Sequence, residues 1–300
     1  MKKTKLEKIL VILGQTATGK SGLAVKLAKK FGGEIISADS RQVYKKLDIG
    51  TGKITKREML GIPHHLIDIL SPKKVFSVSA WKKLAQGKIE EILSRGKLPI
   101  ICGGTGFYIQ SIVDGIVLPV VPPNNTLRKA LERKTLSDLV YMLKKLDPQR
   151  LNSIDTKNAI RLIRAIEIAK ALGKVPEIGR EKSKYNILQI GLTLPDTELR
   201  KRIHKRLLAR IKKGMIQEAQ KLHKKGLSLK RMKELGLEYR YLADYLENKI
   251  TKIELIKKID SEIWHYSKRQ MTWFKRDKRI EWFEPAETKK IYKKVQFFLT

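Results

Sequence analysis

The sequence has a single cysteine, Cys102, among its 300 residues. One thiol excludes a disulfide framework and a cysteine-based metal site, and it is typical of a reducing compartment, so we predict a cytoplasmic protein. Long apolar runs are also missing, since no stretch approaches the roughly 20 residues that a transmembrane helix needs. The sequence therefore predicts a protein that does not span a membrane.

Acidic residues are scarce relative to basic ones. The chain has 30 Asp and Glu residues against 65 Lys and Arg, which gives a formal net charge of +35. A field of this size attracts polyanions, so nucleic acid is the expected partner. Two alternatives stay open, a thermophile-like excess of solvated lysines and a basic surface for anionic lipid.

The most specific motif lies near the N-terminus, where the chain follows the pattern G-x-x-x-x-G-K-S/T. The glycines let backbone N–H groups curl around phosphate oxygens, Lys20 adds a positive charge, and the Ser21 hydroxyl suits a Mg²⁺ ion. An apolar strand at 9–13 precedes this loop, and apolar residues at helical spacing follow it. A plain glycine-rich turn is the alternative. The predicted phosphate-binding residues are Gly14, Gln15, Thr16, Ala17, Thr18, Gly19, Lys20 and Ser21.

Strands and helices alternate through the first part of the chain, with further strands expected at 34–37, at the end of 61–69, and at 98–102. This order predicts an α/β fold with a P-loop NTPase-like core and a parallel sheet. The adjacent His64 and His65 point in different directions in an extended segment, so we expect a structural role and no metal pair.

The pattern changes at Pro119, and it stays helical until an apolar run at 185–192 predicts a strand that returns to the sheet. The remainder of the chain is mostly helical and basic. We therefore predict three segments: the first part of the core at 1–118, a helical insertion domain at 119–184, and the completion of the core with basic helices at 185–300.

Polar residues follow two of the predicted strands. Asp39 comes after the second strand and Thr105 follows Gly103-Gly104, and the carboxyl ends of parallel strands face the ligand crevice. Asp39 suits a metal partner or a general base, or else the N-cap of a short helix. Thr105 suits close approach by a ligand, or else a plain strand-to-helix turn.

Two arginines, Arg161 and Arg164, lie three residues apart on an otherwise apolar helix. Arginine in such surroundings usually meets a carboxylate or a phosphate, so a phosphate contact and an internal ion pair with Glu167 both stay open. Segment 268–276 interleaves basic and aromatic residues, as single-stranded nucleic-acid sites do, although its aromatic residues suit a core equally well.

These motifs occur together, in one order, over about 270 residues, and jointly the chain resembles the tRNA dimethylallyltransferases, also called tRNA isopentenyltransferases. The resemblance implies transfer of a dimethylallyl group from dimethylallyl diphosphate to the exocyclic amine of the adenosine 3′ of a tRNA anticodon. It also implies that the P-loop holds the donor diphosphate, with Mg²⁺ at Ser21, and we expect a monomer that binds the anticodon stem-loop. The matching segments are 14–21, 36–44, 48–51, 63–68, 103–108, 161–167 and 268–273.

By the same matching, Asp39 looks like the general base and Thr105 like a second catalytic position. The segment 236–239 reads Gly-Leu-Glu-Tyr where the family usually has a Gly-Tyr pair, and the insertion is short. The residues expected to contact tRNA are Asp39, Ser40, Arg41, Gln42, Thr105, Arg128, Ile160, Arg161, Leu162, Ile163, Arg164, Lys268, Arg269 and Gln270.

Two other functions are compatible with a P-loop: a small-molecule or nucleotide kinase, and a nucleotide-gated RNA-binding protein without chemistry. The charge of +35 argues against the kinase, because a small metabolite does not need such a field. The acidic residue that P-loop hydrolases place at a strand end is missing, which argues against nucleotide gating.

Overall fold

The computed structural model describes residues 6–177 and 179–300, and the chain divides into two compact units. The larger unit consists of Met1–Asp114 and Lys182–Thr300, and the smaller unit is Gly115–Glu181. We predicted a helical insertion at 119–184, and the smaller unit of the structure spans 115–181.

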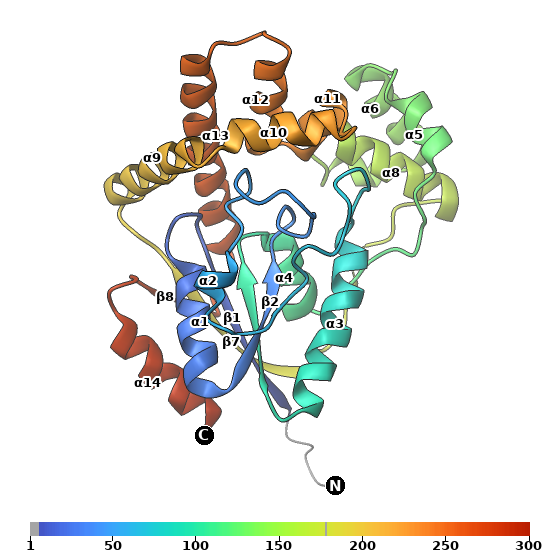
Figure 1. The fold of residues 1–300 in the computed structure, drawn as a ribbon. Coiled ribbons are helices and arrows are strands. Elements are labelled where there is room, and N and C mark those ends of the chain that lie inside the picture. The colour runs from blue at the N-terminus through green and yellow to red at the C-terminus, as the bar shows by residue number, and fades with distance from the viewer. Residues whose placement is uncertain (1–5, 178) are drawn as a thin grey trace, which may run out of the picture. The chain divides into compact units, whose positions relative to one another are not determined.

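A parallel sheet of six strands, counted over the described residues, forms the centre of the larger unit (Figure 1). β1 lies in its interior, where Glu7 is opposite Tyr185 and Gly14 is opposite Leu192. A strand covered on both faces needs a continuous apolar run, which the sequence KILVIL supplies. The order across the sheet is β3 (His64–His65), β2 (Gly33–Ala38), β4 (Leu98–Gly103), β1 (Glu7–Gly14), β7 (Tyr185–Leu192) and β8 (Ile280–Phe283).

Helices cover both faces of this sheet, because alternate side chains of a strand point to opposite sides. Leu10 and Ile12 of β1 pack with one set of helices, and Val11 and Leu13 pack with the other. The first set is α1 (Lys20–Phe31) and α14 (Thr288–Leu299), and the second is α3 (Val78–Ser94), α4 (Gly106–Val113) and the end of α13 (Lys252–Phe274). The predicted α/β fold with a parallel sheet is confirmed.

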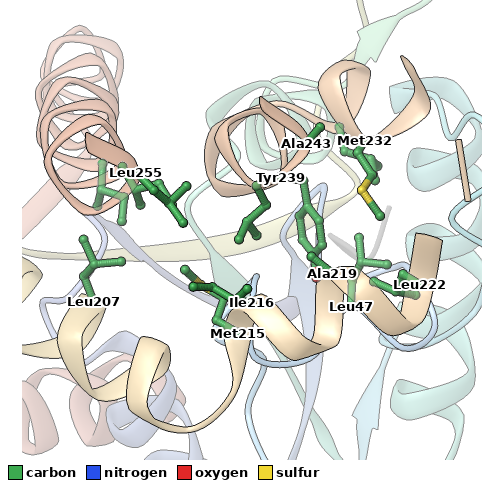
Figure 2. Close-up of a cluster of buried hydrophobic side chains, with 14 of the residues drawn as sticks. Leu47, Leu207, Met215, Ile216, Ala219, Leu222, Met232, Tyr239, Ala243 and Leu255 are labelled. Carbon is green, nitrogen blue, oxygen red and sulfur yellow. The ribbon is translucent and has the colours of Figure 1, made fainter. Parts of the chain in front are cut away.

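A further group of helices packs around its own apolar cluster, part of which Figure 2 shows. The cluster includes Leu47 from the segment after β2 and Tyr239 from α12. None of the helices in the described ranges is both long and apolar enough to cross a membrane. The helices of this group are α9 (Asp196–Lys212), α10 (Met215–Lys224), α11 (Leu229–Leu235), α12 (Leu237–Leu246) and the first part of α13, and the short α2 (Lys56–Met59) precedes β3.

In its described residues, the smaller unit contains helices and two short strands, which pair antiparallel: Ile116 is opposite Arg180. We had expected no clear strand between 124 and 184, where the structure has one at 179–180, because a two-residue strand is too short to leave a periodic pattern. Leu139, Leu143 and Leu162 belong to its apolar core. Its elements are β5 (Ile116–Val117), α5 (Asn125–Leu131), α6 (Leu136–Leu146), α7 (Pro148–Leu151), α8 (Ala159–Leu172) and β6 (Gly179–Arg180).

Candidate functional site

The glycine-rich loop joins β1 to α1, as the motif requires. Gly14 has φ of 130° and Gly19 has φ of 92°, values that side chains with a Cβ rarely adopt. At Gly14 a side chain would also run into the backbone of Leu192 on the neighbouring strand β7. Thr18 is buried, and its hydroxyl donates to the Gln15 carbonyl at 2.8 Å, which closes the loop from inside. The positive-φ glycines and the Thr18 hydroxyl thus contribute to the shape of the loop.

Lys20 is half-buried at the start of α1, and its ammonium group donates to the carbonyl of Gln15. Burial lowers the pKa of Lys20 to about 8, while the negative charge of Asp39 acts in the opposite direction. An anion bound at the loop would favour the charged form. Lys20 is thus a cation poised for an anionic ligand.

Asp39 follows β2 in a tight turn. Its Oδ1 accepts hydrogen bonds from the N–H of Arg41 at 2.8 Å and of Gln42 at 3.3 Å, and its Oδ2 accepts from the Gln42 side chain at 3.2 Å. The short helix that we considered as an alternative is a turn in the structure, so Asp39 caps a turn. This capping fixes the direction of its carboxylate.

Thr105 begins the turn between β4 and α4. Its N–H donates to the Ala38 carbonyl at 3.1 Å, and its Oγ1 accepts from the N–H of Ser40 at 3.0 Å. These two hydrogen bonds hold the Asp39 turn against the end of β4. Thr105 does not line either of the two cavities next to the glycine-rich loop.

Two cavities meet beside the loop. The larger, of about 530 Å³, is lined by Lys20, Ser21 and Gln42 among others, and the smaller, of about 290 Å³, by Ser40 and Arg41 among others. Arg41 lines the smaller cavity, and its buried Nε has no hydrogen-bond partner among the described residues. Residues that line both cavities are Thr16, Ala17, Asp39, Thr51, Arg206 and Tyr266.

A basic helix face completes the larger cavity. Arg202, Lys205 and Arg206 of α9 line it, opposite the loop that we predicted from sequence. The sequence reasoning missed these three residues, although their i, i+3, i+4 spacing places them on one helix face. Arg206 contacts the phosphate loop directly, with a distance of 3.5 Å to the Thr16 hydroxyl. Cationic groups thus surround the cavity from two directions.

Gln270 of α13, which we expected to contact tRNA, makes hydrogen bonds to the glycine-rich loop and to the chain just after β4. Only 6% of the residue is exposed, its Oε1 accepts from the Thr16 N–H at 2.8 Å, and its Nε2 donates to the Gly104 carbonyl at 3.0 Å. Both ends of the amide are occupied inside the protein. Its neighbours Lys268 and Arg269 are exposed, paired with Asp196 and Glu262 respectively.

Histidine and cysteine also reach the larger cavity. His64 lines it, with Nδ1 at 2.8 Å from the Ile62 carbonyl, and His65 contacts Glu34 at 2.7 Å instead. Cys102 lines the cavity as well, and burial raises the pKa of its thiol to about 12. No group of three or more His, Cys, Asp or Glu residues suited to a metal occurs in the described part of the chain.

Two arginines of the smaller unit, Arg128 and Arg164, share one internal carboxylate. Arg128 forms a two-pronged contact with the buried Glu167, at 2.9 and 2.6 Å, and Arg164 also contacts Glu167. Burial alone would raise the pKa of Glu167, but these hydrogen bonds and one from the Asn124 N–H lower it to about 2. The ion-pair alternative for Arg164 is thus what the structure contains.

The other expected contacts of this unit differ in exposure. Ile160 is 81% exposed and Arg161 is exposed beside Asp155, so both are open to a ligand. The side chains of Leu162 and Ile163 instead pack into the core of the unit. A helix that carries a core face cannot present five consecutive side chains outward.

Comparison with known proteins decides the family. A family model described as IPP transferase matches residues 42–277. The chain belongs to the IPP transferase family. The chain is also similar to the tRNA dimethylallyltransferase of Anoxybacillus flavithermus, with 41% identity over 286 residues that cover 94% of this chain and 91% of the relative.

Solved structures of IPP transferases resemble the fold closely. The tRNA isopentenylpyrophosphate transferase of Bacillus halodurans has 36% identity and a TM-score of 0.72, over 97% of this chain and 96% of that one. A eukaryotic dimethylallyltransferase acting on tRNA has 25% identity and a TM-score of 0.73, over 89% and 69%. These relatives favour prenyl transfer over the kinase that we had kept as an alternative.

Proposed function

We propose that this protein transfers a dimethylallyl group from dimethylallyl diphosphate to the exocyclic amine of the adenosine 3′ of a tRNA anticodon. The observation that carries the proposal is the position of Asp39, whose side chain lines both the phosphate-loop cavity and the smaller cavity next to it. A carboxylate between two cavities suits a reaction between two substrates, each in its own compartment. The names of the relatives support tRNA and a dimethylallyl donor as the substrates, and the target adenosine is what the sequence resemblance implies.

The larger cavity suits the donor. Backbone N–H groups of the loop, Lys20 and the α9 cations Arg202, Lys205 and Arg206 would bind the diphosphate, because anions favour helix N-termini and cationic side chains. The rest of the cavity, with Ile35, Ile54 and Ala24, is apolar enough for the five-carbon chain.

Asp39 suits the role of general base. The amine nitrogen attacks the first carbon of the allyl chain and forms an N–C bond, while the C–O bond to the diphosphate breaks and its electron pair leaves with the diphosphate. The amine must lose one proton, and the Asp39 carboxylate accepts it. The target adenine has to leave the base stack of the tRNA to reach Asp39. Holding its amine in line with the departing diphosphate supplies much of the rate enhancement.

Mg²⁺ fits the donors at this site. The Ser21 hydroxyl and the Asp39 carboxylate line the same cavity, and Mg²⁺ is usually held by one or two protein oxygens together with phosphate oxygens and water. We propose Ser21 as its ligand. When bound, the ion would neutralise charge on the departing diphosphate.

tRNA binding is supported by the charge and by exposed cations. Arg41 with its unpartnered Nε and Arg269 line the smaller cavity, and Arg161 and Lys268 are exposed. We propose that these four residues contact the anticodon stem-loop. We further propose that the protein is a monomer and that it works in the cytoplasm, where its tRNA substrate occurs.

One experiment tests the function. The protein is incubated with tRNA and dimethylallyl diphosphate, the tRNA is digested, and the nucleosides are analysed by mass. We expect an adenosine that is heavier by one dimethylallyl group, found in the fragment next to the anticodon. If no prenylated adenosine forms and a parallel incubation with ATP shows that ATP is consumed, the kinase is supported instead.

A further inference from the structure

A loop of five residues, 48–52, forms part of the wall of both cavities. It has the sequence Asp-Ile-Gly-Thr-Gly and lies between β2 and α2 without regular secondary structure. Thr51 lines both cavities and Gly52 lines the larger one. A wall made of irregular backbone needs outside support, because such a segment has few hydrogen bonds of its own.

The amide side of the 48–52 loop is held by one carboxylate, Glu218 of α10. Its Oε2 accepts from the N–H of Asp48 at 3.0 Å and of Ile49 at 2.7 Å, and its Oε1 accepts from the N–H of Gly50 at 2.8 Å. The hydroxyl of Tyr239 adds a fourth hydrogen bond to Oε1 at 2.6 Å. Hydrogen bonds to an ionised acceptor are roughly twice as strong as those between neutral groups.

The carbonyl side of the same loop is held by a guanidinium, Arg210 of α9. Its Nε donates to the Ile49 carbonyl at 2.8 Å, and a terminal nitrogen contacts the Gly50 carbonyl. That nitrogen also lies 2.8 Å from Glu238, and the two residues are only 8% and 9% exposed. Opposite charges thus hold opposite edges of the loop backbone.

Packing leaves the loop little room to move. A Cβ added to Gly50 would lie 2.5 Å from the Tyr239 hydroxyl oxygen, so the backbone is pressed against this ring. Figure 2 shows Tyr239 in the apolar cluster beside Ala219 and Leu47, with its ring fixed by neighbours on α10 and in the chain before the loop. The segment 236–239 supplies both Glu238 and Tyr239.

The far end of the loop reaches the phosphate site through Arg206. The Gly52 carbonyl accepts a hydrogen bond of 2.9 Å from Arg206, and another nitrogen of this guanidinium lies 3.5 Å from the Thr16 hydroxyl of the phosphate loop. Among the residues that the structure describes, no carboxylate forms an ion pair with Arg206. A carbonyl therefore orients the guanidinium and leaves its charge for an anion.

We propose that Glu218 and Tyr239 are positioning residues for the donor diphosphate, which act through the 48–52 loop and Arg206. The inference rests on the proposed function, because it assigns the bound anion to the donor. Glu218 fixes the loop, the Gly52 carbonyl directs the guanidinium, and the guanidinium meets the diphosphate over the phosphate loop. Loss of the carboxylate would let the loop relax and Arg206 turn away.

The test uses the full-length protein, inorganic diphosphate as the probe and titration calorimetry as the measurement. Glu218→Gln keeps the shape but removes the charge, and Tyr239→Phe removes only one hydroxyl. We expect diphosphate affinity to fall about tenfold in Glu218→Gln and by a smaller factor in Tyr239→Phe, because small misplacements of a charged group are costly. Affinity for tRNA should stay within about twofold.

A matched control separates positioning from folding. Asp147→Asn in the smaller unit likewise removes the charge of a carboxylate that accepts backbone N–H groups, here those of Arg150 and Val175. It should lower the melting temperature and leave diphosphate affinity unchanged. If Glu218→Gln melts earlier but binds diphosphate as the wild type does, Glu218 is structural only and the inference is overturned.

A double-variant cycle tests the route through Arg206. If Glu218 acts by directing this guanidinium, Glu218→Gln should change diphosphate affinity by less than about twofold once Arg206→Ala is present. The same tenfold loss in both backgrounds would refute that route. Failure of the proposed function looks different: the wild type would bind diphosphate tightly, and Glu218→Gln weakly, while no prenylated adenosine formed.

Discussion

The Oδ1 atom of Asp39 accepts a hydrogen bond of 2.8 Å from the backbone N–H of Arg41. The carboxylate that we assign as general base is therefore also the cap of its own turn. Capping and proton transfer are compatible, because Oδ2 has a single weaker contact, with the Gln42 side chain at 3.2 Å. The observed capping of the turn and the proposed proton transfer thus use different oxygens of one carboxylate.

Replacement of Asp39 by Ala separates these two roles. We expect the single-turnover rate to fall by about 10²–10⁴-fold, or roughly 3 to 5 kcal/mol of barrier, because a positioned base is lost. The lost cap should cost about 1 kcal/mol of stability. Rates and a melting curve on one preparation decide the matter. A variant that melts early but transfers at the wild-type rate would refute the catalytic role.

Diphosphate binding should weaken as the pH rises through about 8, the lowered pKa of Lys20. The ammonium group is charged below this pH and loses its charge above it, so affinity is greatest on the acid side. Calorimetric titration with inorganic diphosphate between about pH 7 and 9 measures the effect. Lys20→Arg serves as the comparison, since a guanidinium stays charged throughout. An identical decline in the Arg variant would assign the titration to another group.

Binding of tRNA should depend steeply on salt, because the chain carries a net charge of +35. Neutralising six or more phosphates releases counterions, so affinity should fall roughly a thousandfold between about 50 and 200 mM salt. Filter binding or fluorescence anisotropy with an anticodon stem-loop gives the slope. A flat titration would remove nucleic acid as the partner.

Stability of the smaller unit should depend on Glu167. Its pKa lies at about 2 in the folded state against 4.5 for the free group, so its contribution is fully present above pH 4.5 and is lost as the pH falls toward 2. At neutral pH, Glu167→Gln should destabilise the unit by about 2 kcal/mol, because Arg128 and Arg164 lose their shared partner. Denaturant unfolding at pH 7 and pH 4 measures both effects.

The exposed pair of Asp155 and Arg161 is the control for this comparison. A terminal guanidinium nitrogen of Arg161 lies 3.8 Å from Oδ2 of Asp155. Because the pair is exposed, Asp155→Asn should change the free energy of unfolding by less than about 0.5 kcal/mol. Equal effects of the Asp155 and Glu167 substitutions would contradict the view that the buried carboxylate organises the unit.

Features that depend on local sequence were predictable. The strand at 185–192 and the glycine-rich loop follow from an apolar run and from a fixed spacing of glycines, and both are confirmed. The strand β8 was missed, because its four residues acquire a strand conformation through pairing with β7, 88 or more positions earlier in the chain, and not through any pattern of their own. Local propensity carries little information about such pairings.

The residues of the site also divide into those that local sequence motifs predict and those that only the tertiary fold brings together. Asp39 and Lys20 belong to local motifs, whereas Arg206 reaches the phosphate loop from a helix almost two hundred residues away in sequence. Gln270 illustrates the opposite limit: a basic, aromatic surrounding suggested an RNA contact, yet its amide serves the backbone of Thr16. Contact partners of this kind depend on the tertiary fold, which residue spacing alone does not specify.

The interior position of β1 has a consequence for synthesis of the chain. β4 pairs with one side of β1 early, but the other side waits for β7, which follows only after the whole smaller unit has been made. The intervening segment of roughly 80 residues takes about 4 to 16 seconds at the usual rate of translation. During that time the nascent polypeptide carries an open, apolar strand edge, the kind of surface that recruits chaperones or promotes aggregation. Slowing elongation across residues 104–184 should therefore lower the yield of native protein more than slowing it after Leu192.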